Sequence, residues 1–442
     1  MTTFAELGLP QPIVSTLARL DITEAFPIQE AAIPDALAGK DVLGRGPTGS
    51  GKTFTFGLPM LTRLAGAPSR PGHPRGLVLA PTRELAAQIR ERLADPAAAL
   101  GLRVIDVVGG VNINNHIRAL AAPVDLLVAT PGRAEDLINQ QKLSLDAVEI
   151  SCLDEADQMA DMGFLPQVRK LLDRVDRGGQ TMLFSATLDG DVEKLVQRYM
   201  KNPVTHSTAP VEASVETMQH YLLVVKSREE RNDVVERIGA REGKTIMFMR
   251  TKHGVDRQVK KLRRAGINAQ GLHGDKGQGA RTRALSGFSD GSTPVLIATD
   301  IAARGIDIND VSLVVHVDPP AEHKAYLHRA GRTARAGTSG TVVTLALTEQ
   351  VSDVESLLRK AGVHATAAHI HPDSRELVKI TGARTPSGTP LPPPGQQQKP
   401  QAESATRRHK GQGSPAGGTG HLHSQRRGRS GRGRRQQRSS GR

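Results

Sequence analysis

A glycine-rich turn near the start of the chain has the composition of a phosphate-binding loop. Residues 46–53 read GPTGSGKT, the spacing G-x-x-x-x-G-K-[ST], between an expected strand and an expected helix. Glycines allow backbone N–H groups to turn toward phosphate oxygens, Lys52 can reach the terminal phosphates, and Thr53 can offer its hydroxyl to Mg²⁺. An ordinary glycine-rich turn is the alternative, and the flanking strand and helix favour a nucleotide. The expected contacts are Gly46, Pro47, Thr48, Gly49, Ser50, Gly51, Lys52 and Thr53.

Three carboxylates follow one apolar strand in the first half. Asp154, Glu155 and Asp157 come directly after the run VEISCL. A carboxylate at a strand end can hold the water shell of Mg²⁺, and the next one can orient and deprotonate an attacking water. A solvated acidic loop is the alternative, although such loops rarely follow a buried strand in a chain with a phosphate-binding loop.

Several arginines gather in the second half, in HRAGRTAR at residues 328–335. Arg332 and Arg335 are three residues apart, so both can point to one side at the start of a helix. Two guanidiniums there could stabilise charge on a transferring phosphoryl group. Spacing and charge alone do not decide between this role and gripping a nucleic-acid backbone, for which Arg329 and Arg335 are equally suited.

Positive charge is concentrated at the end of the chain. The 442 residues carry a formal charge of +14, and residues 401–442 hold eleven Lys and Arg against one acidic residue, Glu403. A polyanionic partner is favoured, and a solubilising extension is the alternative. Residues 385–442 are rich in Gly, Arg, Ser and Gln, a composition that buries too little apolar surface to fold, so we expect a disordered tail.

Three features predict a soluble, cytoplasmic protein. No run approaches the roughly eighteen uninterrupted apolar residues of a membrane span. The first residues lack a basic region leading into an apolar stretch, so no export signal is expected. Cys152 is the only cysteine, which excludes an internal disulfide and a zinc site made of several thiolates. Its apolar surroundings predict a small buried strand residue.

Two series of strands and helices are needed to position these residues. Short apolar runs alternate with amphipathic stretches such as Arg83–Ala94, the pattern of parallel α/β sheets. Most expected strands end in a polar or glycine-rich turn, and ligands of such sheets bind beyond the strands' carboxyl ends, so the turns should share one rim. The expected strands are Val42–Leu43, Leu77–Ala80, Val104–Val108, Leu126–Ala129, Glu149–Leu153 and Thr181–Phe184, then Thr245–Met249, Ala269–Leu272, Val295–Ala298, Leu313–Val317 and Val342–Leu345.

The motifs of both halves together resemble those of DEAD-box ATP-dependent RNA helicases of superfamily 2, in the bacterial type with a basic C-terminal tail. The resemblance covers roughly residues 4–350 in unbroken motif order. The tetrapeptide 154–157 is weak evidence alone, but the ordered set is specific. Besides the turns above, the set comprises PTRELA at 81–86, GG at 109–110, TPGR at 130–133, SAT at 185–187, Phe248, QxxR at 278–281, TD at 299–300, ARGID at 303–307 and HRAGRTAR at 328–335.

The resemblance implies an enzyme that hydrolyses ATP to ADP and phosphate, with Mg²⁺ as cofactor. RNA would stimulate hydrolysis, and closure of two RecA-like domains would couple it to local unwinding of RNA duplexes or to remodelling of ribonucleoproteins. The implied partners are single-stranded and duplex RNA, bound largely without regard to sequence, and ribosomal or mRNA-decay ribonucleoproteins, with no membrane.

The same resemblance implies the role of each site residue. The catalytic set is Lys52, Asp154, Glu155, Arg332 and Arg335, and Thr53 and Asp154 hold Mg²⁺, partly through water. Further ATP contacts are Phe4, Gln29 and Asp307. Residues that couple hydrolysis to strand separation are Asp157, Ser185, Thr187 and His328. RNA contacts are Pro81, Thr82, Arg83, Gly110, Thr130, Pro131, Arg133, Arg250, Gln278, Arg281, Thr299 and Arg304. Such turns of small residues, N–H groups and arginine can hold a sugar-phosphate backbone without reading bases.

The adenine-recognition segment departs from the family pattern, approximately G-F-x-x-P-T-P-I-Q. Residues 21–29 read DITEAFPIQ. Gln29 is retained and can form paired hydrogen bonds with the adenine edge. Ile22 replaces an aromatic residue and Phe26 replaces threonine, so strict adenine preference is the inherited property that these departures put most in question.

Two smaller departures exchange one small residue for another. Gly46 stands where the family usually has alanine, and Ala334 where it usually has glycine. Both exchanges are expected to be tolerated where the local φ is negative.

Three rival classes fit the sequence less well. A duplex-DNA helicase of the same superfamily would share the phosphate loop and acidic turn. Its RecQ type also carries a cysteine-ligated zinc domain, which a chain with a single cysteine cannot form. A scaffold with an inactive ATPase would be expected to lack Lys52, Glu155 or the arginines. An unrelated phosphate-loop kinase or transporter would lack the arginine motif of the second half.

The expected fold is therefore α/β, with two tandem RecA-like domains built on parallel sheets. The ATP-binding domain is expected at 1–205, with the adenine-recognition segment at about 4–29. A linker at 206–218, a C-terminal helicase domain at 219–375 and the basic tail at 385–442 follow.

Overall fold

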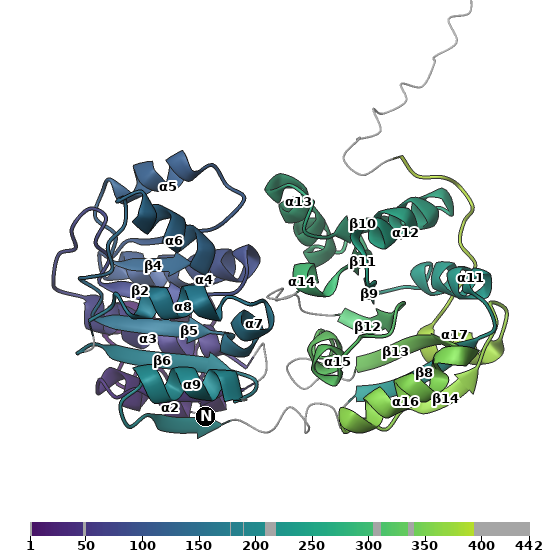
Figure 1. The fold of residues 1–442 in the computed structure, drawn as a ribbon, viewed down its shortest axis with the longest axis horizontal. Helices are drawn as coiled ribbons and strands as arrows, with labels where there is room; N and C mark the ends of the chain where they lie inside the picture. The colour runs from purple at the N-terminus through teal and green to yellow at the C-terminus, as the bar shows by residue number, and fades with distance from the viewer. Residues whose placement is uncertain are drawn as a thin grey trace, which may run out of the picture. The chain divides into compact units, whose positions relative to one another are not determined.

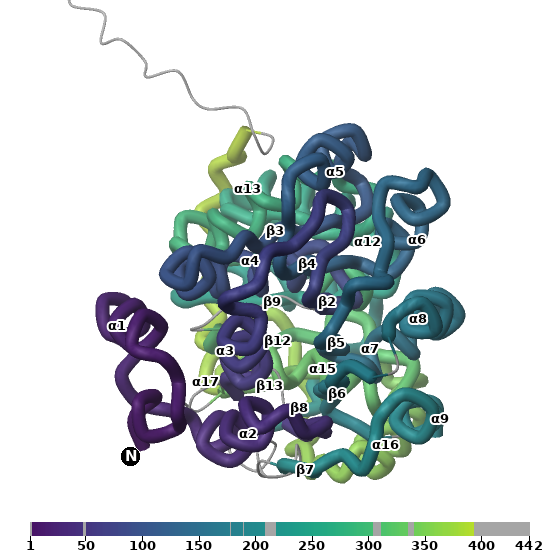
Figure 2. Tube along the Cα trace, turned by 90° about the vertical axis from the view of Figure 1, so that its left-hand side faces the viewer, coloured from purple at the N-terminus to yellow at the C-terminus, as the bar shows by residue number. Residues whose placement is uncertain are grey.

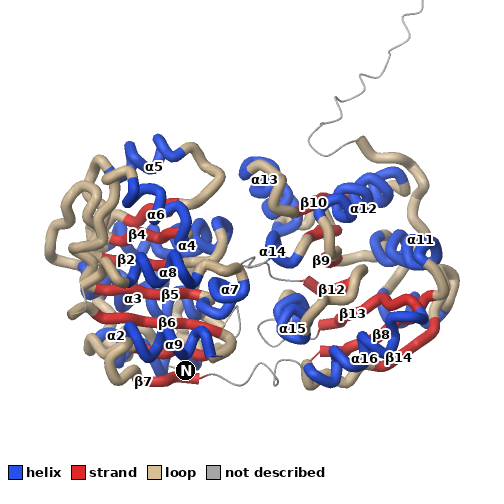
Figure 3. Tube along the Cα trace, in the orientation of Figure 1, coloured by secondary structure: helices blue, strands red, loops and turns tan. Residues whose placement is uncertain are grey.

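Two sheets of parallel strands, one in each half of the chain, organise the protein (Figure 1). The computed structural model describes residues 2–46, 50–176, 178–188, 190–207, 218–303, 311–334 and 340–392. Within these ranges each sheet has seven strands, with helices on both of its faces (Figure 3). The predicted α/β class with two parallel sheets is confirmed. Each sheet with its own helices is called a lobe below.

The first lobe has the strand order β3-β4-β2-β5-β6-β1-β7. Its inner strands read as continuous apolar runs because helices cover both faces, and every residue of β2, β4 and β5 is buried. The strands are β1 (Val42–Arg45), β2 (Gly76–Leu79), β3 (Val104–Val107), β4 (Leu126–Ala129), β5 (Ile150–Asp154), β6 (Gln180–Ser185) and β7 (Val204–Ser207).

From β1 onward, the helices of the first lobe connect these parallel strands and bury apolar faces against them. Helix α1 packs against α4 and lies at the edge of the lobe in Figure 2. The helices are α1 (Gln11–Arg19), α2 (Pro27–Leu37), α3 (Lys52–Leu64), α4 (Arg83–Ala99), α5 (Ile113–Leu120), α6 (Pro131–Asn139), α7 (Ala156–Asp161), α8 (Leu165–Leu172) and α9 (Gly190–Tyr199).

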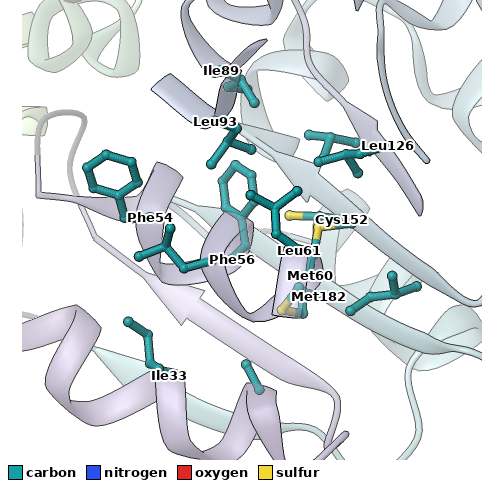
Figure 4. Packing of buried hydrophobic residues seen from close by; sticks show 14 of the residues in the cluster. Ile33, Phe54, Phe56, Met60, Leu61, Ile89, Leu93, Leu126, Cys152 and Met182 are labelled. Carbon is teal, nitrogen blue, oxygen red and sulfur yellow. The ribbon is translucent and has the colours of Figure 1, made fainter. Parts of the chain in front are cut away.

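Side chains of the first sheet enter two apolar clusters, one on each face. Val78 belongs to one cluster and Leu77 to the other, because successive strand residues point to opposite faces. Figure 4 shows the cluster that contains Phe56 of α3, Leu93 of α4 and Cys152 of β5. Burial raises the pKa of the Cys152 thiol well above its usual value, so the thiol stays protonated in the core. Cys152 is thus the buried strand residue that the sequence predicts.

The second lobe has the strand order β10-β11-β9-β12-β13-β8-β14. The same alternation separates its core into two clusters, so that Val314 lies in one and Val315 in the other. The strands are β8 (Met218–Val225), β9 (Lys244–Phe248), β10 (Ala269–Leu272), β11 (Val295–Ala298), β12 (Val311–His316), β13 (Gly340–Leu347) and β14 (Thr366–His369).

The helices of the second lobe lie between successive strands of its sheet, except the last one, which follows β14. Three of them begin with a side-chain cap, in which Ser227, Thr251 or Ser374 accepts a hydrogen bond from a backbone N–H of the first turn. The helices are α11 (Arg228–Gly239), α12 (Lys252–Arg264), α13 (Gln278–Ser289), α14 (Asp300–Ala303), α15 (His323–Ala330), the 3₁₀ turn η2 (Thr348–Gln350), α16 (Val351–Lys360) and α17 (Arg375–Thr381).

The chain continues beyond α17 along the second lobe. The N–H of Gly388 donates to the carbonyl of Ala265 at 3.0 Å, and that of Leu391 donates to the carbonyl of Arg263 at 2.8 Å. Residues 382–392, called the strap below, are therefore held against the end of α12. The sequence assigned 385–392 to a disordered tail, and these backbone hydrogen bonds correct that prediction. Residues 393–442 lie outside the described residues.

The region expected as a linker also contains strand residues at both ends. β7 extends to Ser207 and pairs with β1, and β8 begins at Met218 and pairs with β13. Residues 208–217 between them lie outside the described residues. In the part of the chain that the structure describes, no helix is both long and apolar enough to cross a membrane.

Candidate active site

Three turns of the candidate site follow three neighbouring strands. β6 lies between β1 and β5, and all three run parallel, so their carboxyl ends lie at one rim. Arg45 at the end of β1 is in register with Ser185, and Asp154 at the end of β5 is in register with Phe184. The sheet therefore brings the glycine-rich turn, the acidic turn and Ser185 together.

The glycine-rich turn leads from β1 into α3. Lys52 begins the helix with only 7% of the residue exposed, and its Nζ donates a hydrogen bond to the carbonyl of Gly46 at 2.9 Å. Its ammonium thus lies beside Gly46, the first residue of the turn. Thr53 is buried beside it, and Ser50 precedes the helix. Pro47, Thr48 and Gly49 lie outside the described residues.

Gln29 ties the N-terminal segment to this turn. Its buried Nε2 donates to the carbonyl of Gly51 at 2.9 Å, and its Oε1 accepts from the N–H of Phe26 at 2.9 Å. Gly51 has a φ of 91°, and a Cβ placed on it would lie 2.7 Å from Gln29 Nε2. Only glycine fits both the backbone conformation and this close approach.

Phe26 presents an exposed aromatic ring beside the phosphate-binding turn. The residue is 50% exposed, and its Cδ2 lies 2.9 Å from the position that a Cβ added to Gly51 would occupy. Ile22, at the position where the family has an aromatic residue, packs against the first core cluster. Phe4, expected as an ATP contact, is only 2% exposed and lies in that cluster, so its side chain contributes to packing.

The acidic turn places two buried carboxylates side by side. Asp154 is 3% exposed, and its Oδ1 accepts a hydrogen bond from the N–H of Glu155 at 3.0 Å. Burial raises the pKa of Asp154 to about 7, although the Lys52 ammonium acts in the opposite direction. Glu155 adopts a φ of 54° and a ψ of 52°, a left-handed conformation unusual for a residue with a side chain. This conformation marks the junction between β5 and α7.

A hydrogen-bonded network connects the acidic turn to the turn after β6. Asp157 Oδ2 accepts from the N–H of Thr187 at 3.1 Å and from its hydroxyl at 3.3 Å. The Ser185 hydroxyl donates to the carbonyl of Thr187 at 2.7 Å and accepts from the N–H of Asp157 at 3.3 Å. A displacement of the β6 turn would therefore be transmitted directly to the acidic turn.

The arginines of the second half have different surroundings. Arg329 is 3% exposed; its Nη2 donates to Asp300 Oδ2 at 2.8 Å, and its guanidinium lies over the ring of Phe248. Arg332 is 5% exposed, and its Nε donates to the carbonyl of His328 at 3.3 Å. Arg304, Asp307 and Arg335 lie outside the described residues.

Two of the expected RNA-binding turns in the first lobe also begin helices. Thr82 caps α4 by accepting a hydrogen bond from the N–H of Leu85 at 3.2 Å, and it follows Pro81 at the end of β2. Pro131 occupies the first position of α6, after Thr130 at the end of β4. Backbone N–H groups at such helix starts suit phosphate oxygens.

The arginines of these turns are held by specific neighbours. Gly110 has a φ of 73°, and a Cβ there would overlap the guanidinium of Arg83. Arg133 makes a 2.7 Å contact with His116 Nδ1 and donates to the carbonyl of Val111 at 2.9 Å. Burial, reinforced by the Arg133 charge, lowers the pKa of His116, which favours the neutral ring that accepts this hydrogen bond.

The expected RNA contacts of the second lobe differ in exposure. Arg250 is exposed at the end of β9, and its backbone N–H donates to Asp318 Oδ2 at 2.9 Å. Gln278 begins α13 half-buried, and Thr299 follows β11. Arg281 is buried, and its Nε donates to Glu84 Oε1 at 2.7 Å, so it already has a carboxylate partner.

The structure shows two left-handed residues at family glycine positions and adds partners that the sequence did not reveal. Ala334 has a φ of 54°, so the condition of a negative φ is not met and the replacement of the family's glycine is strained there. Asp21, also at a family glycine position, has a φ of 58°. His116 and Asp300 were missed as partners of the motif arginines because they are distant in sequence. Phe26 could have been identified as an isolated aromatic residue directly before a retained motif.

Comparison with known proteins gives consistent matches over both lobes. Residues 26–195 match the family model described as DEAD/DEAH box helicase, and residues 229–337 match that of the helicase conserved C-terminal domain. DEAD-box ATP-dependent RNA helicase 3B, chloroplastic, from Zea mays is 42% identical over 367 residues, 81% of this chain and 49% of that protein. The chain thus spans about half the length of this relative. DEAD-box ATP-dependent RNA helicase CshA from Geobacillus kaustophilus is 38% identical over 361 residues, 81% of this chain and 76% of that protein.

Solved structures with the same fold include complexes with RNA. S. cerevisiae Dbp5 bound to RNA and ADP BeF3 has a TM-score of 0.77 and 28% identity, covering 86% of this chain and 99% of that chain. Mss116p bound to ssRNA and AMP-PNP has a TM-score of 0.72 and 26% identity, covering 86% of this chain and 82% of that chain. The predicted tandem RecA-like architecture is confirmed by this likeness.

Proposed function

Because the chain belongs to the DEAD-box ATP-dependent RNA helicase family, we propose that it hydrolyses ATP and uses the reaction to unwind short RNA duplexes or to remodel ribonucleoproteins. ATP and RNA together would favour a closed arrangement of the two lobes, because both ligands bind that state better. Hydrolysis and release of the products would reopen it.

The observation that carries the proposal is the network between the acidic turn and the turn after β6. Asp157 shares hydrogen bonds with both Ser185 and Thr187, immediately beside the strand that leads to the glycine-rich turn. An enzyme that only hydrolyses a nucleotide does not need such a connection. In a motor, a change at the nucleotide must be communicated to the surface that binds RNA.

We assign the steps of hydrolysis to residues of this rim. Lys52 would bind the terminal phosphates, since its ammonium already donates to a carbonyl inside the turn. Glu155 would orient the attacking water and accept its proton. Arg332, together with Arg335, would stabilise the charge that develops on the transferred phosphoryl group.

The oxygen donors of the rim suit Mg²⁺. Thr53 offers a hydroxyl and Asp154 a carboxylate, both buried beside Lys52. Within the described ranges no three His, Cys, Asp or Glu side chains converge, so the cation would depend on these oxygens, the phosphates and water. When bound, Mg²⁺ would neutralise charge on the phosphates. The residues present therefore fit the ion.

RNA would be held mainly through its sugar-phosphate backbone. The turns at Thr82, Gly110 and Thr130 combine backbone N–H groups with the arginines Arg83 and Arg133, and none of them presents an aromatic ring for stacking on bases. Ribosomal or mRNA-decay ribonucleoproteins in the cytoplasm remain part of the proposal as physiological targets.

ATP turnover should be measured with RNA, with single-stranded DNA of the same sequence and with duplex DNA. We expect RNA to stimulate turnover strongly and DNA little, because the 2′-hydroxyl contributes to backbone recognition. Lys52→Ala should abolish the signal and serves as the control for a contaminating ATPase. Equal stimulation by single-stranded DNA would replace the RNA assignment by a DNA one, and absence of turnover with every nucleic acid would refute the proposed enzyme.

A further inference from the structure

Helix α12 of the second lobe carries an unusual density of positive charge. Its sequence, KHGVDRQVKKLRR, contains six Lys or Arg and a single acidic residue, Asp256. Val255, Val259 and Leu262 are buried in the lobe's core, which fixes the orientation of the helix. The charged residues consequently occupy the remaining faces.

Three of these cations form one exposed row. Arg257, Lys260 and Arg264 are all exposed and are separated by three and four residues, the spacing of one helix face. The row spans about 10 Å along the helix axis, at about 1.5 Å per residue. Arg257, Lys260 and Arg264 are called the basic stripe below.

Among the described residues, the other cations of α12 have polar partners, whereas no ion pair or side-chain hydrogen bond involves the basic stripe. Lys252 pairs with Asp275 at 2.6 Å, Lys261 with Glu236 at 3.1 Å, and Arg263 donates to Asn268 Oδ1 at 2.7 Å. Asp256 is occupied by Lys276 at 2.7 Å. Across residues 2–392, gaps excepted, no carboxylate forms an ion pair with any cation of the basic stripe. Three neighbouring guanidinium and ammonium groups repel one another unless an anion lies between them.

The position of α12 links two parts of the protein that are expected to meet RNA. Arg250, an expected RNA contact, lies two residues before the helix. The other end of α12 (Figure 1) is held by the strap, and the basic residues 401–442 follow the strap in the sequence. The basic stripe thus lies on the helix that leads from the candidate RNA site to the strap.

We propose that the basic stripe is an additional RNA-backbone contact, which holds the part of a long RNA that extends beyond the candidate site. The proposal rests on the proposed function. Arg257, Lys260 and Arg264 would each contact phosphate oxygens, without reading bases. The chain's own tail cannot be the occupant, since residues 401–442 hold eleven cations and only one carboxylate.

The surroundings of the basic stripe favour RNA over an acidic protein. Protein interfaces have an apolar, often aromatic centre surrounded by a polar rim. The exposed large apolar residues among those described are Leu20, Phe26, Ile301 and Val378, and none of them lies on α12. A polar, cationic row without an apolar centre suits a phosphate backbone, whose contribution to binding is electrostatic.

The test compares Arg257→Gln/Lys260→Gln/Arg264→Gln with the unchanged full-length protein. Affinity is measured over a salt series for a short RNA that fills only the candidate site and for a long RNA that extends beyond it. On the long RNA the log–log salt slope should become shallower by about 2, because each phosphate contact on a single strand contributes about 0.7. Affinity for the short RNA and turnover at saturating short RNA should not change.

Matched variants separate position from total charge. Arg359→Gln/Lys360→Gln/Lys379→Gln removes three exposed cations from α16 and α17 of the same lobe and should leave the slope unchanged. Arg257→Lys/Arg264→Lys keeps the charge and should keep the wild-type slope. Unchanged melting temperatures are expected, since all these residues are exposed.

Two results would overturn the proposal. The first is an unchanged slope on long RNA in the triple variant. The second is that the triple variant loses affinity for a polyglutamate peptide but not for long RNA, which would point to an acidic protein instead. Failure of the proposed function itself gives a different result, because RNA would then not stimulate turnover even in the unchanged protein.

Discussion

Replacement of Arg329 by alanine should mainly destabilise the second lobe. The guanidinium donates to both carboxylate oxygens of Asp300 and to the carbonyl of Asp318 at 2.9 Å, and it lies 5.1 Å from the ring centre of Phe248. The residue is only 3% exposed. A side chain with this many internal partners acts primarily as a structural crosslink, although the sequence suited it equally well to gripping RNA.

The magnitude follows from these contacts. Removing one partner of a buried ion pair costs about 3–5 kcal/mol, because the remaining charge is left without compensation. The Asp300 side chain is 34% exposed, so water can solvate part of its charge after the change. We therefore expect a loss of about 2–4 kcal/mol in the free energy of unfolding. With a urea dependence of about 2 kcal/mol per M, the midpoint should fall by about 1–2 M.

Urea unfolding followed by circular dichroism measures this loss, with Arg329→Lys and Arg359→Ala as comparisons. Arg329→Lys keeps the charge but loses the two-pronged geometry, so an intermediate loss is expected. Exposed Arg359→Ala should change the free energy by about 0.5 kcal/mol or less. A midpoint unchanged in Arg329→Ala, together with a strong loss of RNA-stimulated turnover, would refute the structural role.

Three further changes test other parts of the site. Glu155→Gln keeps the side-chain size but cannot accept a proton, so turnover should fall by at least ~10²-fold while equilibrium binding of ATP and RNA is retained; near-normal turnover would remove Glu155 from the role of base. Phe26→Thr should weaken adenine and guanine nucleotides alike, by about tenfold in competition binding, since a ring face stacks on any base; unchanged affinities would show that the ring does not meet the base. Burial, with the nearby charge of Arg329, holds the pKa of His316 well below its usual value. The unfolded chain therefore binds a proton that the folded lobe does not, and stability should fall as pH drops below about 6.5. Urea midpoints at several pH values should show this fall, and His316→Gln should flatten it; the same slope in both proteins would contradict the assignment.

Except for β8, the inner strands were predictable from the sequence because both their faces are buried. β4 and β11 have the bounds that their apolar runs predict, and so does β10, although it lies at a sheet edge. Of the edge strands, β7 and β14 were missed, because a strand at the margin of a sheet need not be apolar. β7 reads VTHS and β14 reads TAAH, and no residue of either strand is fully buried. Their pairing depends on backbone hydrogen bonds with β1 and β8, which leave little trace in composition.

The types of the site residues were predictable, but their surroundings were not. The spacing of residues 46–53 and 154–157 depends on local turns, which the sequence encodes directly. The contact of Arg133 with His116 joins residues on separate elements, and that of Arg329 with Asp300 crosses 29 positions. Such contacts arise only when the strands have assembled, so the burial of Arg329 was not evident from charge and spacing.

The left-handed backbone conformation of Glu155 makes folding stability and activity favour different residues at this position. Alanine in this conformation is strained by about 1 kcal/mol relative to glycine, so of the two substitutions that delete the carboxylate, Glu155→Gly should fold more stably than Glu155→Ala. A mutant library sorted only for thermal resistance should consequently enrich glycine over alanine at position 155. A library sorted for growth that depends on turnover should retain glutamate and tolerate neither. The ratio of glycine to alanine among survivors therefore reports which of the two pressures a population has experienced.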